Sequence, residues 1–393
     1  MDSQDILQTP QIHPFQFDNS SDQIAKTVNL FRGDVNFKIP LVSLTGRNGL
    51  DLQVAALYKS NISKQAVTRN LTAPTSILGL GWDMPVDRIE VETNGTGTRE
   101  DNIYYFVRTG IRNRLYRNNK SWLRGEIDKS LADDLDNQNF SKALSAALLT
   151  QGLRTDTSSS VTVQTAGSCW QITDPVNEFV LRLSLASAAS KIKVFDGGYS
   201  YEMQGYDFSR IRYYEQFERW EITFSNGITS VFGGNLTVTD GVKSSRNKTI
   251  EWGVRIGNWH GPGILTHSSS DSDKRLQTQY AKVWHFASSY TIWNDRVTFE
   301  YEQVLQNVGA DGLPYIKATY LSKVTGVLGR TIHFNYKEKT YDDSTPKSPR
   351  EYADPYKATP TNDPDAYQSK YETRYLSDIE VNNEKGDELF TLN

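Results

Sequence analysis

A strand–turn–strand pattern recurs along this chain of 393 residues and constrains its fold more than any other feature. The segment YLSKVTGVLGRTIHFNY (320–336) aligns with YLSDIEVNNEKGDELFTLN (375–393), and residues 206–227 form a looser third copy. The two closer copies share Tyr-Leu-Ser, a turn that contains Gly, and an alternating apolar strand. Because such a unit cannot bury its apolar face alone, the copies are expected to pair into an extended sheet.

Short strands are predicted along most of the chain. Val35, Phe37 and Ile39 alternate with polar residues, and Asn48-Gly49 can take the positive φ angles of a hairpin turn. From residue 158 onward, the spacing of strands and turn signals suits antiparallel sheets rather than βαβ units. The 21 tyrosines also fit sheet surfaces. The sequence therefore predicts a mainly β protein built from antiparallel sheets and strand repeats.

One segment has helical spacing instead. In NFSKALSAALLTQGL, the apolar residues Ala143, Leu144, Ala147 and Leu148 fall on one helical face, and Gly152 is a plausible stop. We predict one small helical insertion at about 127–153. The predicted organisation is an extended arm at 1–27, a β region at 28–126, the insertion at 127–155, a second β region at 156–341, an irregular loop at 342–371 and a terminal β unit at 372–393.

Charge and composition exclude several classes of partner. The formal net charge is −4, which gives no reason to expect nucleic acid as the main partner. Apolar runs are far shorter than the ~20 residues of a membrane span. No signal peptide is recognisable, so synthesis in the cytoplasm is expected. Cys169 is the sole cysteine, so the fold must depend on packing rather than on an intramolecular disulfide.

The stretch SILGLGWDMPVDRIEV (76–91) contains two glycines, Gly79 and Gly81, that suggest a phosphate loop. A dinucleotide loop needs Gly-x-Gly-x-x-Gly between a strand and a helix. Met84 occupies the third position, Pro85 follows it, and VDRIEV is a strand pattern. We therefore predict a structural role, in which the glycines let a neighbouring strand or a ring such as Trp82 pack closely.

No metal, cofactor or catalytic residue is predicted. His260 and His267 lie seven residues apart near Asp271 and Asp273, but His in loops next to Gly and Ser is usually a surface residue. Cys169, beside Trp170 in a strand pattern, is better explained as a buried small residue than as a nucleophile.

Two functions of other classes stay open as alternatives. A carbohydrate-binding or carbohydrate-active protein could use the aromatic residues Tyr201, Tyr206, Trp252 and Trp259 to stack on sugars, which makes a glycan a possible partner. An ADP-ribosyltransferase would use Arg255, the serines of HSSSDS (267–272) and the pair Glu300 and Glu302. Their order is right, but these serines lie in a polar loop, and alternating glutamates are ordinary for a half-exposed strand.

The block from Val28 to Val91 resembles the opening of SpvB-like domains. Those domains begin the B components of Tc toxin complexes and related Rhs (YD-repeat) proteins. The residues that carry the resemblance are Leu57, Tyr58, Ser60, Gly79, Leu80, Gly81, Trp82 and Ile89. The resemblance is good over about residues 28–110 and fair over residues 200–393.

The resemblance implies a scaffold rather than a catalyst. In the family, such segments help build a curved, hollow β-shell that encloses a toxic C-terminal polypeptide, which a partner pore delivers. It thus implies an encapsulating role, other toxin segments or subunits as partners, and release as part of a toxin complex. The final strand, LFTLN, is expected to continue in a longer protein.

Overall fold

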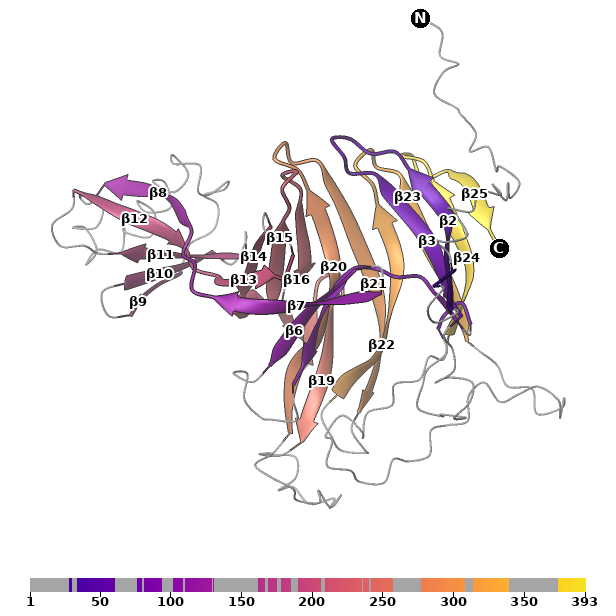
Figure 1. Ribbon diagram of the computed structural model, residues 1–393, viewed down its shortest axis with the longest axis horizontal. Coiled ribbons are helices and arrows are strands. Elements are labelled where there is room, and N and C mark those ends of the chain that lie inside the picture. The colour runs from indigo at the N-terminus through magenta and orange to yellow at the C-terminus, as the bar shows by residue number, and fades with distance from the viewer. Residues whose placement is uncertain are drawn as a thin grey trace, which may run out of the picture.

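The computed structural model describes most of the β-rich part of the chain, and Figure 1 shows its arrangement. The described residues are 28–29, 34–60, 76–79, 81–93, 102–108, 110–128, 130, 162–166, 169–174, 178–184, 190–205, 209–234, 236–239, 242–256, 277–307, 314–338 and 374–393. The predicted arm at 1–27 and the predicted loop at 342–371 lie outside these residues.

The described strands form four antiparallel sheets. The first sheet contains β1 (Val28–Asn29), β2 (Asp34–Leu44), β3 (Leu52–Lys59) and β4 (Trp82–Asp83). The second has the order β8-β12-β11-β10-β9, with β8 (Leu123–Asp128), β9 (Thr162–Ala166), β10 (Cys169–Asp174), β11 (Phe179–Ser184) and β12 (Lys191–Asp196). A small hairpin consists of β17 (Leu236–Thr239) and β18 (Val242–Ser245).

The largest sheet has 14 described strands. They are β5 (Arg88–Glu92), β6 (Ile103–Arg108), β7 (Ile111–Asn118), β13 (Tyr199–Met203), β14 (Arg210–Tyr214), β15 (Arg219–Thr223), β16 (Thr229–Gly233), β19 (Ile250–Ile256), β20 (Gln277–Tyr290), β21 (Arg296–Asn307), β22 (Pro314–Thr325), β23 (Thr331–Glu338), β24 (Arg374–Asn382) and β25 (Glu388–Leu392). A single turn of 3₁₀ helix, η2 (Glu215–Phe217), joins β14 to β15.

Part of this sheet closes on itself. The path β16-β15-β14-β13-β7-β6-β5-β20 becomes a ring of eight strands because β16 also pairs with β20, for example Val231 with Ser288. Aromatic side chains fill the ring. Trp220 is fully buried, stacks on Tyr213 at 4.4 Å between ring centres and meets Trp284 edge-on at 5.9 Å. The high aromatic content therefore serves mainly to fill this core.

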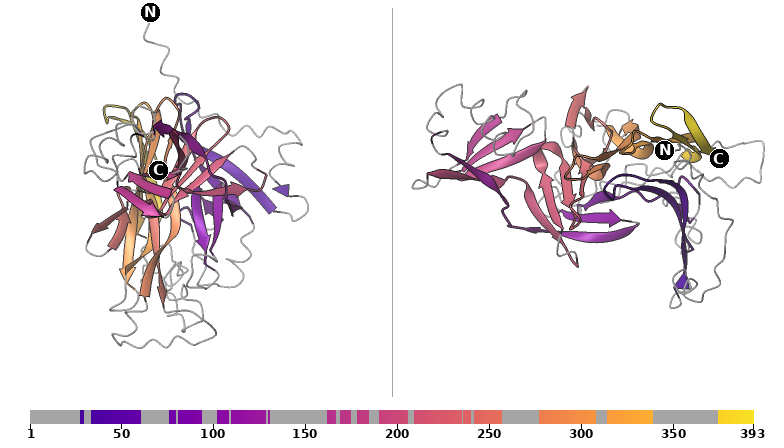
Figure 2. Two further views of the ribbon diagram at one scale, coloured as in Figure 1. Left: turned by 90° about the vertical axis from the view of Figure 1, so that its left-hand side faces the viewer. Right: turned by 90° about the horizontal axis from the view of Figure 1, so that it is seen from above.

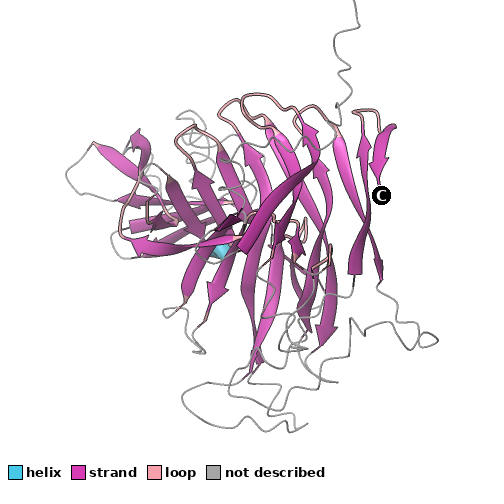
Figure 3. Cartoon of the chain, turned by 45° about the vertical axis from the view of Figure 1, so that its right-hand side comes forward, coloured by secondary structure: helices cyan, strands magenta, loops and turns pink. Residues whose placement is uncertain are grey.

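Beyond the ring, strands β21 to β25 continue as an open sheet. The predicted repeat is confirmed here, because residues 320–336 contain hairpin β22–β23 and residues 375–393 contain hairpin β24–β25. The looser copy at 206–227 contains hairpin β14–β15 within the ring. Fold class is likewise as predicted: the chain is mainly antiparallel β, and strands dominate the view in Figure 3.

The four-stranded sheet packs over the open sheet as a second layer, which Figure 2 shows from above. Val42, Leu52 and Val54 of β2 and β3 share a core with Val324 and Val381 of the large sheet. The tip of the β2–β3 hairpin also contacts the β20–β21 turn, where the Asn48 amide donates a hydrogen bond to Asp295 Oδ2 at 2.6 Å. The predicted Asn48-Gly49 turn is confirmed, with φ values of 53° and 81°.

The predicted helix at 127–153 starts too early. Ile127 and Asp128 belong to strand β8, where Ile127 is buried and pairs with Ile192 of β12. The prediction was wrong at this end because the apolar residue Ile127 fits the two-residue period of the preceding strand as well as the period of a helix. Residues 131–153 lie outside the described part of the chain.

Candidate functional site

Tyr58 and Trp82 of the SpvB-like block come together at strands β3 and β4. Tyr58 and Trp82 are direct partners across these strands, and their rings lie 5.1 Å apart between centres. The amide of Lys59 donates a hydrogen bond to the carbonyl of Gly81 at 2.8 Å. The predicted structural motif of Tyr58, Gly79, Gly81 and Trp82 is therefore one compact unit, and no phosphate loop leads into a helix there.

Gly79 serves this unit for a different reason than the one predicted. Gly79 has a φ of 95° and Gly81 a φ of 79°, in the region that favours glycine. A Cβ built on Gly79 would meet nothing within 4 Å, so close approach is not what requires a glycine at this position. The amide of Trp82 donates to the carbonyl of Gly79 at 3.3 Å, which indicates a turn that needs positive φ.

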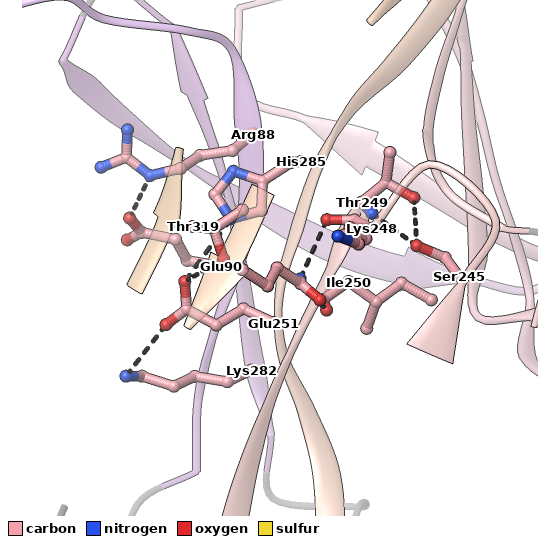
Figure 4. Close-up of polar contacts among 11 residues, drawn as sticks. Arg88, Glu90, Ser245, Lys248, Thr249, Ile250, Glu251, Lys282, His285 and Thr319 are labelled. Atoms are coloured by element: carbon pink, nitrogen blue, oxygen red, sulfur yellow. Dashed lines mark hydrogen bonds and ion pairs between the residues drawn. The ribbon is translucent and has the colours of Figure 1, made fainter. Parts of the chain in front are cut away.

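A half-buried ionic cluster lies where β19, β20 and β22 meet (Figure 4). Glu251 accepts a hydrogen bond from Lys282 Nζ at 3.4 Å and one from the Thr319 hydroxyl at 3.3 Å. His285 Nε2 is 3.5 Å from Glu251 Oε2, at the outer limit of a hydrogen bond. Nearby, Gln303 Nε2 donates to the carbonyls of Lys248 and Ile250.

The neighbours of Glu251 keep its carboxyl group ionised. Burial alone would raise the pKa of Glu251, but the contact with His285 and the charge of Lys282 outweigh burial and lower the pKa to about 2. The carboxylate is therefore held in its ionised form by partners from two neighbouring strands. A fixed network of ion pairs of this kind is better suited to holding neighbouring strands together than to proton transfer.

A second group of buried charges joins the five-stranded sheet to the ring. Arg212 of β14 is 1% exposed, and its Nε lies 3.6 Å from Asp196 Oδ2 of β12. The hydroxyl of Tyr214 donates to the same carboxylate oxygen at 3.1 Å. Arg219 of β15 pairs with Glu178, which precedes β11, at 3.1 Å.

A hollow of about 560 Å³ opens beside this junction. We call it the Trp122 hollow. Its lining residues are Tyr116, Asn118, Lys120, Trp122, Ser200, Tyr201, Glu202, Met203, Gln204, Gly205 and Ser209. Trp122 and Tyr116 are 38% and 41% exposed, so two aromatic rings border a partly polar space.

The aromatic residues predicted to stack on sugars have mixed outcomes. Tyr201 lines the Trp122 hollow, but its side chain is only 8% exposed and packs against Trp220. Trp252 is 1% exposed inside the ring, so its predicted surface role is wrong. The alternation pattern could not show this, because a strand in a closed ring with a covered outer face is buried on both sides. Tyr206 and Trp259 lie outside the described residues.

The other candidate residues are not brought together by the described structure. Glu300 and Glu302 lie on β21, and Glu302 Oε2 pairs with Arg374 at 3.3 Å. Arg255 lies on β19, while the serines at 267–272, together with His260 and His267, are outside the described residues. Within the described part, no three His, Cys, Asp or Glu residues are grouped so as to hold a metal ion. No described helix is long and apolar enough to cross a membrane.

A basic run was missed by sequence reasoning. Residues 111–125 (IRNRLYRNNKSWLRG) contain four arginines, one lysine and no acidic residue. The formal net charge of −4 is a sum over the whole chain and hides this run. Net charge calculated in a short sliding window along the sequence would have found it. The run forms β7 and the start of β8, and it supplies one wall of the Trp122 hollow.

Comparisons with known proteins give similarity of fold. No family model and no curated protein matches the chain. The N-terminal domain of effector protein SpvB from Salmonella typhimurium strain LT2 is similar with 13% identity, a TM-score of 0.39, and coverage of 88% of this chain and 86% of that one.

Two structures of Tc toxin components are also similar. TcdB2-TccC3 matches with 12% identity and a TM-score of 0.38 over 90% of this chain and 13% of that chain. The Photorhabdus luminescens Tc holotoxin pore matches with 13% identity and a TM-score of 0.34 over 89% of this chain. The chain therefore spans 13% of the length of these Tc components.

Proposed function

We propose that this chain is a scaffold segment of a Tc-type toxin component, where it forms part of a β-wall that encloses a toxic polypeptide. One observation carries the proposal: four residues of the SpvB-like block, Tyr58, Gly79, Gly81 and Trp82, form a single unit around the Tyr58–Trp82 contact, although Tyr58 lies more than 20 positions from the other three. That unit belongs to the sheet that lies over the open sheet β21–β25. Motif residues that contact one another in the fold support the proposal better than similarity of the sequence alone.

The architecture suits a wall. A continuous antiparallel sheet grows by about 4.8 Å with each strand, so hairpin repeats extend an enclosing surface without a new type of packing. The buried charges described above pair across strands and between sheets, which holds such a surface in shape. Partners in this role are other segments or subunits of the toxin complex, and release from the cell is a property of the assembled complex.

The test is isolation of the protein from its native source through a tag on the chromosomal gene. We expect it within a particle much larger than the 44.5 kDa of this chain, together with further toxin segments or subunits. Limited proteolysis of that particle should spare an enclosed polypeptide that is digested once the particle is denatured. A free species of 44.5 kDa, with no associated toxin component, would contradict the proposal. A strain that carries the same tag on an unrelated cytoplasmic protein is the control.

A further inference from the structure

We propose that the Trp122 hollow binds a pyranose sugar that carries an anionic group, as in carboxylated or sulfated oligosaccharides. This site is separate from the Tyr58–Trp82 unit, so it adds to the scaffold role and does not depend on it. Three properties of the hollow support the assignment: fixed aromatic faces, several hydrogen-bonding side chains, and arginines without carboxylate partners.

The aromatic faces are held in place. Trp122 Nε1 donates to the Ser200 hydroxyl at 3.4 Å, and the buried guanidinium of Arg212 lies 5.4 Å from the centre of the Trp122 ring. The ring therefore has a defined orientation although it is 38% exposed. A fixed, half-exposed ring can stack on the apolar face of a sugar at little cost in conformational entropy.

The space and the polar groups fit one or two sugar rings. The hollow of about 560 Å³ lies within the usual range of roughly 300–1,000 Å³ for small-molecule sites. Asn118, Ser200, Gln204 and Ser209 supply amide and hydroxyl groups, which can bind sugar hydroxyls. Glu202 is already partnered, since it accepts hydrogen bonds from Asn118 Nδ2 at 3.1 Å and Lys120 Nζ at 3.4 Å.

Arginines beside the hollow favour an anionic ligand. The guanidinium of Arg114 lies 5.0 Å from the Tyr116 ring centre, and that of Arg210 lies 5.9 Å from the Trp122 ring centre. Among the described residues, neither has a carboxylate within the 4.0 Å of an ion pair, although Arg88, Arg108, Arg112 and Arg374 of the same sheet all do. A sugar stacked on Tyr116 or Trp122 would place its acidic substituent near one of them.

A nucleic acid fits these features less well. Its phosphates repeat along the strand, so a bound segment would bring several charges across the hollow, where Glu202 is 54% exposed at its side chain. A sugar with a single acidic substituent can direct that group toward Arg114 or Arg210 and its hydroxyls toward Glu202. We therefore favour the acidic sugar and use a nucleic acid as a competing outcome in the test.

The experiment is isothermal titration of the full chain with three hexasaccharides: a heparin fragment, a hyaluronan fragment and neutral maltohexaose. We expect at least one acidic hexasaccharide to bind and maltohexaose to bind at least tenfold more weakly. Arg114→Gln and Trp122→Ala should each weaken the binding of the acidic hexasaccharide at least tenfold. Trp293→Ala, which removes a 67% exposed ring from a distant turn, is the matched control and should leave binding unchanged.

Several outcomes would overturn the assignment. They are no binding of either acidic probe at millimolar concentration, equal binding of the neutral probe, or full affinity in both Arg114→Gln and Arg210→Gln. Full affinity in Arg114→Gln with a tenfold loss in Arg210→Gln would support the site and assign the acidic group to Arg210. Tighter binding of a twelve-residue oligothymidylate would assign the surface to nucleic acid instead. Because Trp122 contacts the buried Arg212, Tyr116→Ala serves as a second variant if Trp122→Ala does not fold, with circular dichroism as the check.

Discussion

At the scale of residues, one short turn recurs in four hairpins of the large sheet. The turn occupies five residues and is found at 224–228, 291–295, 326–330 and 383–387. In each of these segments, the amide of the first residue donates to the carbonyl of the fifth residue, and the amide of the fourth residue donates to the carbonyl of the first. The fourth residue has a positive φ each time: it is glycine in three turns and Asn294, at 64°, in the other. These turns correspond to three-residue hairpin loops with a left-handed residue.

This shared geometry predicts the effect of substitutions at Gly386, whose φ is 89°. Gly386→Ala should lower the free energy of unfolding by about 1–2 kcal/mol, because a Cβ is strained at positive φ. Gly386→Asn should cost less, since asparagine already occupies the equivalent position 294. A Cβ at 386 would meet nothing within 4 Å, so strain alone is measured. Urea denaturation of the two variants tests this, and equal losses would refute it.

The lowered pKa of Glu251 should make the free energy of unfolding depend on pH. Its pKa is about 2 in the folded chain against an ordinary value of 4.5, so it stabilises the fold above pH 4.5 and loses this contribution as the pH falls toward 2. The shift corresponds to about 3 kcal/mol. The wild type should therefore lose about that much more stability than Glu251→Gln between pH 5 and pH 2, as measured by urea denaturation. Glu384→Gln, on an exposed turn, is the control, and a constant difference between wild type and Glu251→Gln would contradict the assignment.

At the scale of elements, buried charges attach the five-stranded sheet to the ring. The Arg212 guanidinium donates to the carbonyls of Lys120 and Gly198 at 3.3 and 3.4 Å, in addition to its contact with Asp196. One side chain thus contacts the segment that enters β8 and the turn that leaves β12. Hydrophobic packing would hold the two sheets without fixing their angle, whereas these directed contacts fix it.

Removal of this arginine should be costly. Arg212→Met leaves the buried carboxylate of Asp196 without its cation, and loss of one partner of a buried pair costs about 3–5 kcal/mol. The double variant Arg212→Met with Asp196→Leu should recover part of that loss, because no charge then stays buried alone. Lys385→Met, on an exposed turn, should change stability by less than about 0.5 kcal/mol. Urea denaturation measures all three, and a loss below about 1 kcal/mol for Arg212→Met would contradict this account.

At the scale of the whole molecule, two hydrophobic cores meet at one strand. The core of the ring and the core between the two sheet layers both contact Phe286 of β20. Its ring lies 5.2 Å from Phe232 on one side and 4.6 Å from Phe299 on the other. Since β20 also pairs with β5, β16, β19 and β21, it ties the ring to the open sheet.

This arrangement predicts that the ring and the open sheet unfold together. Three of the eight tryptophans, Trp220, Trp252 and Trp284, are buried in the core of the ring, so tryptophan fluorescence gives extra weight to the ring, whereas circular dichroism reports on all strands. Both signals should change at the same urea concentration in the wild type. Phe286→Ala should lower stability by about 3–5 kcal/mol and separate the two transitions. Separate transitions in the wild type would show that the two cores are independent.

The sequence alone determined the local structure. Alternating residues such as Val35, Phe37 and Ile39 predicted strands, and Asn48-Gly49 predicted a hairpin, because side-chain period and positive φ are local properties. The repeat at 320–336 and 375–393 predicted neighbouring hairpins. The sequence did not show that Tyr58 and Trp82 of the SpvB-like block contact each other, and it did not show that Gly79 serves the turn through its positive φ rather than through space.

Only the tertiary structure decided which strands are neighbours and which side chains reach solvent. Pairing of β16 with β20 closes the ring, and Trp252 of β19, the strand that also pairs with β20, joins the buried core. No local pattern encodes contacts between strands so far apart in sequence. The same reason explains why the basic run at 111–125 was missed: its charge matters only where the fold sets it beside Ser200 and Glu202 of β13. Local periodicity fixes the face of a strand, but the partner that covers this face is a property of the whole chain.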